Sequence, residues 1–144
     1  MLQKGREPSR YFIDGLTMMR FTLIAFLACS LLSAGIASAQ SLTGPQRNAV
    51  RSAQSYLSLQ GFSRDGLIEQ LSSPYGDNYN RADATAAVDS LSVDWNAQAA
   101  RSARQYLSMM GFSCRGLIEQ LSSSFGDKYT NSQATYGAQQ AGAC

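Results

Sequence analysis

The sequence of 144 residues contains no histidine and only three cysteines. Histidine is the commonest general base and the commonest imidazole ligand for metals, so its absence removes the usual arrangements for both. Cys114 and Cys144 are the two cysteines outside the apolar N-terminal segment, and two thiolates without histidine are too few for a zinc site. We therefore expect neither a metal nor another cofactor.

The sequence also lacks a cluster of charges of one sign. Residues 40–144 carry eight Lys or Arg and eight Asp or Glu, so this segment is formally neutral. Nucleic-acid-binding proteins depend on clustered Lys and Arg to displace counterions from phosphates. The charge pattern therefore predicts that nucleic acid is not a partner.

No group of residues has the composition of a catalytic site. Glu69 and Glu119 lie on the predicted solvated face of amphipathic helices. The serine pairs at 72–73 and 122–123 have no histidine or lysine partner to activate a hydroxyl. The turn at Gly76-Asp77 lacks the ligand string of an EF-hand loop. We predict that the chain is not an enzyme and takes no small-molecule substrate.

An apolar run at residues 21–36 follows Arg20 and precedes the small-residue sequence Ala37-Ser38-Ala39. A membrane-spanning helix needs about 20 predominantly apolar residues, and this run is shorter. An A-x-A ending is typical of signal-peptide cleavage. We predict that residues 1–39 are a signal peptide cleaved before Gln40, and that the mature protein is periplasmic or secreted.

The N-terminal segment leaves alternatives open. Translation starts at Met1, or at Met18 or Met19, which directly precede the basic residue of the signal. A retained membrane anchor is one alternative to cleavage, and a lipoprotein attached through Cys29 is another. A lipid-attachment cysteine normally follows small apolar residues, whereas Cys29 follows Leu27 and Ala28, so the lipoprotein is the weaker interpretation.

The most informative pattern is a repeat with an offset of fifty residues. The segment 51–79, RSAQSYLSLQGFSRDGLIEQLSSPYGDNY, recurs at 101–129 as RSARQYLSMMGFSCRGLIEQLSSSFGDKY. Of the 35 positions from 51 to 85, 22 are identical in the second copy. Two copies of this length predict a tandem pair of small domains, 40–94 and 95–144, because a solenoid normally needs three or more repeats.

The first helix of copy one is predicted over 46–59, where apolar residues recur at helical spacing. Thr43 and Gln46 have the spacing of a capping box at its start. Gly61, repeated as Gly111, is placed to end the first helix in a left-handed conformation.

The second helix is predicted to begin after an N-cap serine, Ser63 or Ser113, with Phe62 or Phe112 as the preceding hydrophobic staple. The third helix is predicted to begin after Asn80 in copy one. In copy two it begins after Thr130, where a second capping box is expected with Gln133. The fold class is therefore all-α, with two tandem three-helix modules of helix-turn-helix character.

The copies meet at Asp94 and Trp95, where two arrangements are open. Asp94 caps the first helix of copy two, or the third helix of copy one runs through into it as one continuous rod. Trp95 is the only tryptophan. Because a domain of about fifty residues is marginal alone, we expect Trp95 to pack the two copies together.

The repeat provides an internal comparison for the two remaining cysteines. Cys114 corresponds to Arg64 and Cys144 to Asp94, so a disulfide in copy two aligns with a candidate ion pair in copy one. The disulfide should stabilise by about 3–4 kcal/mol and an exposed ion pair by about 0–1 kcal/mol. An oxidising compartment permits the bridge. The alternative is a frayed terminal thiol and a separate surface thiol.

Two further residue types recur in both copies. The first type is tyrosine, whose repeated positions indicate packing in the core or between the modules rather than a ligand cage. The second type is arginine, which is a candidate to form an ion pair with the acidic side chain of the turn that follows. These residues are Tyr56, Tyr79, Tyr106 and Tyr129, and Arg51 and Arg101.

The repeat resembles the Ltp family of host cell-surface-exposed lipoproteins. The residues that carry the resemblance are R-S-A-x-x-Y-L-S-x-x-G-F-S-x-x-G-L-I-E-Q-L-S-S, followed by G-D-x-Y and the linker V-D-W-N. The resemblance covers nearly all of residues 46–144. It implies tandem helical modules and a role in superinfection exclusion, in which the exported protein binds a phage protein and keeps incoming phage DNA out of the cell. A phage or envelope protein is the implied partner.

The resemblance assigns no partner-binding residues, because the shared residues are mostly core and caps. A binding surface is expected where the copies differ, as at Asn78 against Lys128 or Asp65 against Arg115. The alternative function is a structural or envelope-associated helical protein with no phage role. Contact with a membrane is expected only through the signal or a lipid anchor.

Overall fold

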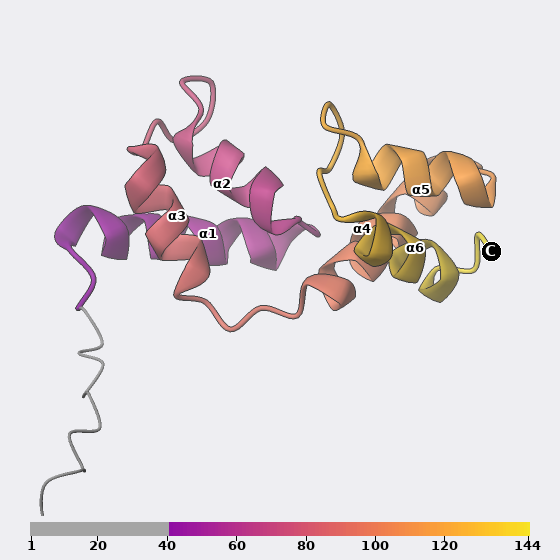
Figure 1. The fold of residues 1–144 in the computed structure, drawn as a ribbon, viewed down its shortest axis with the longest axis horizontal. Coiled ribbons are helices and arrows are strands. Elements are labelled where there is room, and N and C mark those ends of the chain that lie inside the picture. Colours follow the sequence, from indigo (N-terminus) through magenta and orange to yellow (C-terminus); the bar gives the residue numbers. More distant parts are fainter. Residues whose placement is uncertain (1–40) are drawn as a thin grey trace, which may run out of the picture. The chain divides into compact units, whose positions relative to one another are not determined.

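Six helices make up the regular structure of residues 41–144, the part of the chain that this computed structural model describes (Figure 1). Helices α1 and α2 contact α3, and α4 and α5 contact α6, which gives two three-helix modules. These residues contain no strand, so the prediction of an all-α fold is confirmed. The helices are α1 (Gly44–Leu59), α2 (Arg64–Ser72), α3 (Arg81–Asp89), α4 (Trp95–Met109), α5 (Cys114–Ser122) and α6 (Asn131–Gln140).

The predictions for the N-terminal segment lie outside the described residues. They concern the signal peptide at 1–39, its cleavage before Gln40, the choice of start residue and the fate of Cys29. Among α1–α6, none combines the length and the apolar character that a membrane-spanning helix requires.

The helices begin where local capping chemistry predicts. Thr43 and Thr130 both form complete capping boxes, each with the glutamine three residues later. The Ser63 hydroxyl accepts a hydrogen bond from the Gly66 amide, and Ser113 does the same for the next copy. These contacts satisfy backbone N–H groups that have no partner inside the helix.

The predicted left-handed glycines at the ends of the first helices are wrong. Helix α1 ends at Leu59, and its C-cap residue Gln60 is extended, with a φ of −149°. Gly142 is the only described glycine with a positive φ. Gly61 has a different purpose, because a Cβ there would lie 2.4 Å from the Ser102 hydroxyl oxygen and 2.7 Å from the Gln98 carbonyl oxygen. Close approach of another helix, rather than backbone handedness, requires glycine at this position.

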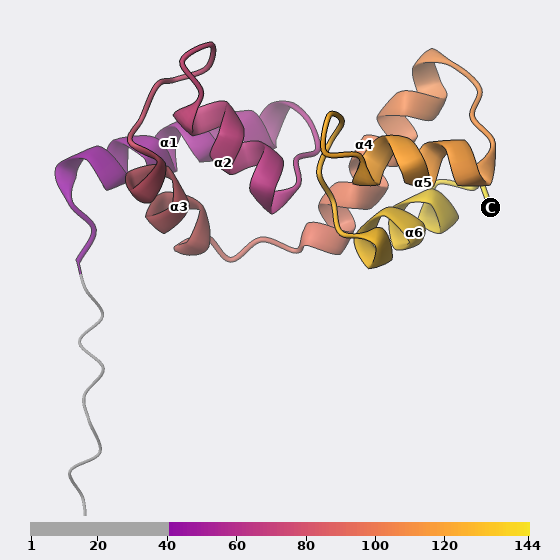
Figure 2. The ribbon, with the colours of Figure 1, turned by 45° about the horizontal axis from the view of Figure 1, so that its top comes forward.

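Each module has its own small core. Alanines on the first and third helices bring those helices close together, which can be followed in Figures 1 and 2, and leucines from the second helix fill the space between them. An aromatic pair in T-shaped contact closes each core, with ring centroids 5.7 Å apart in both modules. The buried core residues of module 1 are Ala53, Leu67, Ile68, Leu71, Ala84 and Val88, and those of module 2 are Ala99, Ala103, Leu117, Leu121, Tyr129, Ala134 and Ala138.

The connection between the modules is broken rather than continuous. Helix α3 ends at Asp89, and Asp94 is an extended N-cap whose carboxylate accepts hydrogen bonds from the amides of Asn96 and Ala97. The capped alternative is therefore the correct one. Trp95 is the first residue of α4, yet it packs against the core of module 1 and so links the two modules.

Candidate functional site

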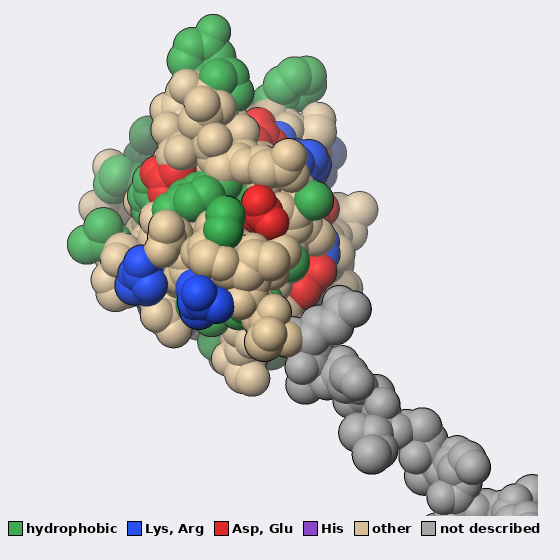
Figure 3. All heavy atoms as spheres, turned by 90° about the vertical axis from the view of Figure 1, so that its left-hand side faces the viewer, with side chains coloured by type: hydrophobic (Ala, Val, Ile, Leu, Met, Phe, Trp, Pro, Cys, Tyr) green, Lys and Arg blue, Asp and Glu red, His purple; other side chains and the backbone are tan. Residues whose placement is uncertain are grey.

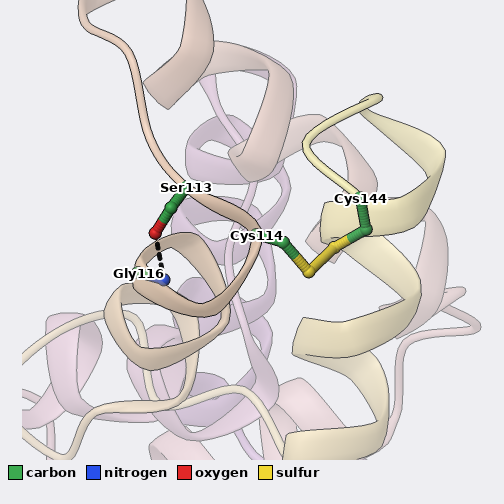
Figure 4. Close-up of a disulfide and its surroundings, with 4 residues drawn as sticks. All are labelled: Ser113, Cys114, Gly116 and Cys144. Carbon is green, nitrogen blue, oxygen red and sulfur yellow. Dashed lines mark hydrogen bonds between the residues drawn. A yellow bond between two sulfur atoms is a disulfide. The ribbon is translucent and has the colours of Figure 1, made fainter.

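A disulfide joins the start of the second helix to the end of the chain in module 2. Cys114 is the first residue of α5 and bonds to Cys144, with 4.8 Å between their Cα atoms (Figure 4). Beside it, the Ser113 hydroxyl caps the same helix through the amide of Gly116. The bridge therefore fastens the N-terminus of α5 to the segment that follows α6.

The corresponding position of module 1 carries an ion pair, but not the predicted one. Arg64 donates two hydrogen bonds to Asp89, at 2.7 and 2.8 Å, and a third to Asp65. Asp94 is committed to capping α4 and does not contact Arg64. The pairing with Asp94 is therefore wrong, because Asp94 lies beyond the end of α3 and is the N-cap of α4.

A tyrosine bonded to an aspartate braces the turn after the second helix in each module. The Tyr56 hydroxyl donates to the Asp77 carboxylate at 2.7 Å, and the Tyr106 hydroxyl donates to Asp127 at 2.9 Å. A glutamine of the second helix donates to each tyrosine oxygen. The predicted packing role of these tyrosines is therefore accompanied by a polar one.

The network of module 2 is the more buried of the two. Burial raises the pKa of the Asp127 carboxyl, and burial together with the bond to Asp127 raises the pKa of Tyr106. In module 1 the bond to Asp77 is the main cause that raises the pKa of Tyr56. Burial also raises the pKa of Tyr129, whose hydroxyl lies 2.9 Å from that of Ser102.

In module 1, the end of α1 and the segment that follows it contact helix α4 of module 2. We call this contact the module junction. The Arg101 guanidinium donates to the carbonyl oxygens of Leu57 at 2.6 Å and Ser58 at 2.9 Å. These are carbonyls at the C-terminal end of α1, where a cation is favourable. Arg51 donates instead to Asn48 of its own helix. The expected pairing of both arginines with turn carboxylates is therefore wrong.

Three more polar contacts complete the module junction. The amide of Gly61 donates to the Gln105 side chain at 3.0 Å. The buried Ser63 hydroxyl donates to the carbonyl oxygen of Asp127. Lys128 forms an ion pair with Glu69.

The Lys128 pair bears on two predictions. Lys128 and Asn78 are the difference at which a partner surface was expected, and Lys128 binds within the chain. Glu69, predicted to be solvated, is half exposed and also takes part in this pair. Arg115, the other expected difference, pairs with Glu119 one turn away on an exposed face.

A groove of about 550 Å³ lies next to the module junction. Its walls come from the segment between α1 and α2, from α2 itself, and from the turns that follow α2 and α5. Tyr75 and Phe125, at equivalent positions of those two turns, line the groove and are both 100% exposed. Sequence reasoning missed this pair, although the repeat of an aromatic residue before Gly76 and Gly126 was available as a signal.

The face of the molecule seen in Figure 3 carries no large patch of side chains with the same charge. Acidic and basic side chains lie scattered among uncharged ones, and hydrophobic side chains project at the upper edge, the side on which the turns after α2 and α5 lie in Figure 1. In the described residues, no group of three or more acidic or cysteine side chains is arranged to hold a metal ion.

Comparison with known proteins shows what this chain is similar to. The chain is similar to the solved structure of Ltp, a superinfection exclusion protein from the Streptococcus thermophilus temperate phage TP-J34. The two are 31% identical with a TM-score of 0.61, and the similarity covers 69% of this chain and 97% of that one. No curated protein sequence matches the chain.

The family model described as host cell surface-exposed lipoprotein matches twice, at residues 45–91 and 94–140. The two matches correspond to the two modules and together span more than half of the chain. The chain therefore belongs to the family of host cell surface-exposed lipoproteins.

Proposed function

We propose that this protein is an exported, non-catalytic binding module that acts in superinfection exclusion, by binding a phage or envelope protein and keeping incoming phage DNA out of the cell. The observation that carries the proposal is the similarity to the exclusion protein of phage TP-J34, which extends over 97% of that chain and both modules of this one. The apolar run before Gln40 and the disulfide between Cys114 and Cys144 both favour an oxidising location outside the cytoplasm.

The groove beside the module junction is the surface best suited to a protein partner. Interfaces are enriched in aromatic residues at their energetic centres. A fully exposed aromatic side chain gains nothing for folding, and here two such residues, Tyr75 and Phe125, border one groove. The lining is otherwise mostly polar and includes Gln60, Gln70 and Ser124, whose side chains can form hydrogen bonds with the backbone of a partner.

The test is expression of the full chain in a phage-sensitive host, with phage DNA uptake measured directly after adsorption. The native chain should let phage adsorb but reduce the amount of DNA that enters. The variant Tyr75→Ala with Phe125→Ala should lose most of this protection, because large interface anchors typically contribute 2 kcal/mol or more, or about 30-fold in affinity.

A matched control is Tyr136→Ala, which removes an exposed aromatic side chain of α6 that does not line the groove. This variant should protect as well as the native chain does. Undiminished DNA uptake in cells that export the native chain would contradict the phage role. That result, joined to co-purification with cell-wall material, would favour the alternative of an envelope-associated structural protein.

Export has its own test, which is the intact mass of the protein recovered from cells before and after reduction. A species that begins at Gln40 and gains two hydrogens on reduction is the expected result. A lipid-sized addition on Cys29 would instead show the lipoprotein form. An uncleaved chain with free thiols would contradict export.

A further inference from the structure

The module junction uses only half of the docking surfaces that the repeat provides. We call the surface that module 2 contributes to the junction the receiving face, and the surface that module 1 contributes the docking end. The receiving face is formed by Arg101, Ser102, Gln105, Asp127 and Lys128, with Tyr129 bonded to Ser102, and the docking end is formed by Leu57, Ser58, Gly61, Ser63 and Glu69. The repeat places a receiving face on module 1 as well, at Arg51, Ser52, Ser55, Asp77, Asn78 and Tyr79, and a docking end on module 2, at Leu107, Ser108, Gly111, Ser113 and Glu119.

The receiving face of module 1 is open. A groove of about 540 Å³ is lined by its residues and by Leu59, which is 73% exposed. Ser52 and Tyr79 are half-buried, whereas the equivalent Ser102 and Tyr129 are each 3% exposed. The same residue types are thus buried in module 2, where the docking end covers Ser102, and only half-buried in module 1.

The docking end of module 2 keeps a glycine that the chain itself does not require. A Cβ on Gly61 would meet the Ser102 hydroxyl and the backbone of α4 within 2.4–2.8 Å, so glycine is necessary inside the module junction. A Cβ on Gly111 would have no neighbour within 4 Å among the described residues, and its φ is not positive. Ser113 is likewise exposed, whereas Ser63 is 2% exposed.

We infer that a second copy of this chain docks on the receiving face of module 1, through the docking end of its module 2. In that contact the Gly111 backbone of one copy approaches Ser52 of the other, and Arg51 releases Asn48 to donate to the carbonyl oxygens of Leu107 and Ser108. The contact joins unlike surfaces, so it does not close on itself and copies add head to tail. The inference is independent of the phage role.

Two differences between the receiving faces make the contact between copies weaker than the junction within one chain. Ser55 stands where Gln105 accepts the hydrogen bond from Gly61. Asn78 stands where Lys128 pairs with Glu69. The copies also lack the covalent connection that holds the modules at high local concentration. Association between copies is therefore reversible and depends on protein concentration.

These two differences supply a gain-of-function test. The variant Ser55→Gln with Asn78→Lys gives module 1 the receiving face of module 2. Lysine is tolerated in this backbone conformation, since Lys128 has a φ of 59° and Asn78 a φ of 57°. One added hydrogen bond and one added ion pair should tighten the association about tenfold. Gly111→Ala should abolish it, because its Cβ would face the contacts that exclude alanine at Gly61.

The measurement is sedimentation velocity of the protein recovered from cells that express the full chain, from micromolar to millimolar concentration. The expected result is an average mass that rises with concentration without stopping at a dimer, rises earlier in Ser55→Gln with Asn78→Lys, and stays at one chain in Gly111→Ala. Two results would overturn the inference. One is a monomer at all concentrations even in the strengthened variant, and the other is a dimer that is unaffected by Gly111→Ala.

Discussion

The two modules have almost the same framework but are exposed on opposite sides. Gly61 and Ser63 of the docking end are covered in module 1, whereas their equivalents in module 2 are exposed. The receiving face shows the reverse, because it is more buried in module 2 than in module 1. As a result Tyr129 is 3% exposed and Tyr79 is only half-buried, although both occupy the same place beside a serine of the first helix. The comparison shows that burial in this protein depends on the order of the modules along the chain as much as on the residues of each module.

The modules also differ in how the second and third helices are fastened. Module 2 has the disulfide between Cys114 and Cys144, and module 1 has the pair of Arg64 with Asp89. A covalent bridge restricts the unfolded chain whatever the solvent, whereas this ion pair has side chains 41% and 47% exposed and is weakened by water and salt. Module 2 should therefore be the more stable module while the bridge is intact.

The largest expected effect is loss of the disulfide. Cys114→Ser with Cys144→Ser opens a loop with a sequence separation of 30 and should lower the free energy of unfolding by about 3–4 kcal/mol in the chain-entropy model. Urea denaturation followed by far-UV circular dichroism measures the loss. The matched change in module 1, Arg64→Ala, should cost about 0–1 kcal/mol. Equal losses in the two variants would mean that the bridge contributes no more than a surface ion pair.

The second effect concerns the module junction and the two repeated glycines. Gly61→Ala forces a Cβ against the backbone of α4 and should destabilise the protein by about 1–3 kcal/mol through overpacking. Gly111→Ala should be neutral or stabilise by up to about 1 kcal/mol, since it restricts the unfolded chain without a clash. Trp95 fluorescence is the suitable probe, because this residue of α4 packs on the core of module 1 and reports the junction. A loss of similar size in both variants would show that the approach of α4 is not what requires glycine.

Local features of the sequence predicted most of the fold. Capping by Thr43, Ser63 and Thr130 depends on groups within three residues, and all three were predicted correctly. The helix-spaced apolar residues likewise identified the core faces. Such features can be predicted because the interacting groups are neighbours in the sequence.

The errors concern contacts between distant segments. The purpose of Gly61 is set by α4, more than thirty residues later, and Arg64 pairs with Asp89 rather than Asp94 because Asp94 caps α4. The candidate groove depends on how the turns with Tyr75 and Phe125 are placed by the module junction. That placement is hard to predict from a single sequence, because most of the hydrogen bonds across the junction pair a side chain with a backbone carbonyl or amide, and every residue carries those backbone groups.

A third and smaller effect sharpens the comparison of the tyrosines. Tyr129→Phe removes a hydroxyl that lies 2.9 Å from the buried Ser102 hydroxyl and leaves that group unpaired, so it should cost about 1–2 kcal/mol. Tyr79→Phe removes a longer contact of 3.3 Å to the half-buried Ser52, where water can replace it, and should cost less than about 0.5 kcal/mol. Thermal unfolding of the two variants distinguishes them. A reversed order would mean that the docking end does not shield Tyr129 from water.

The smallest expected effect is a difference in how the modules respond to acid. Arg64 lowers the pKa of Asp89, so the stability from this pair is present above the unfolded value near 4 and is lost as the pH falls through the folded pKa. Burial raises the pKa of Asp127, so its contribution is greatest below the unfolded value and is lost as the pH rises through the folded pKa. Acid should therefore destabilise module 1, by less than about 1 kcal/mol for an ion pair this exposed, and favour module 2.

Two variants separate these opposed contributions. Asp89→Asn should remove part of the acid sensitivity of Trp95 fluorescence in urea titrations at pH 7 and pH 3. Asp127→Asn keeps an oxygen that accepts the hydrogen bond from Tyr106 but no longer titrates, so it should make the protein more acid-sensitive than the native chain. If both substitutions changed the acid response in the same direction, the Asp127 carboxyl would be stabilised as an anion by Tyr106 more than it is penalised by burial. The greater burial of module 2 would then no longer be the feature that separates the two networks.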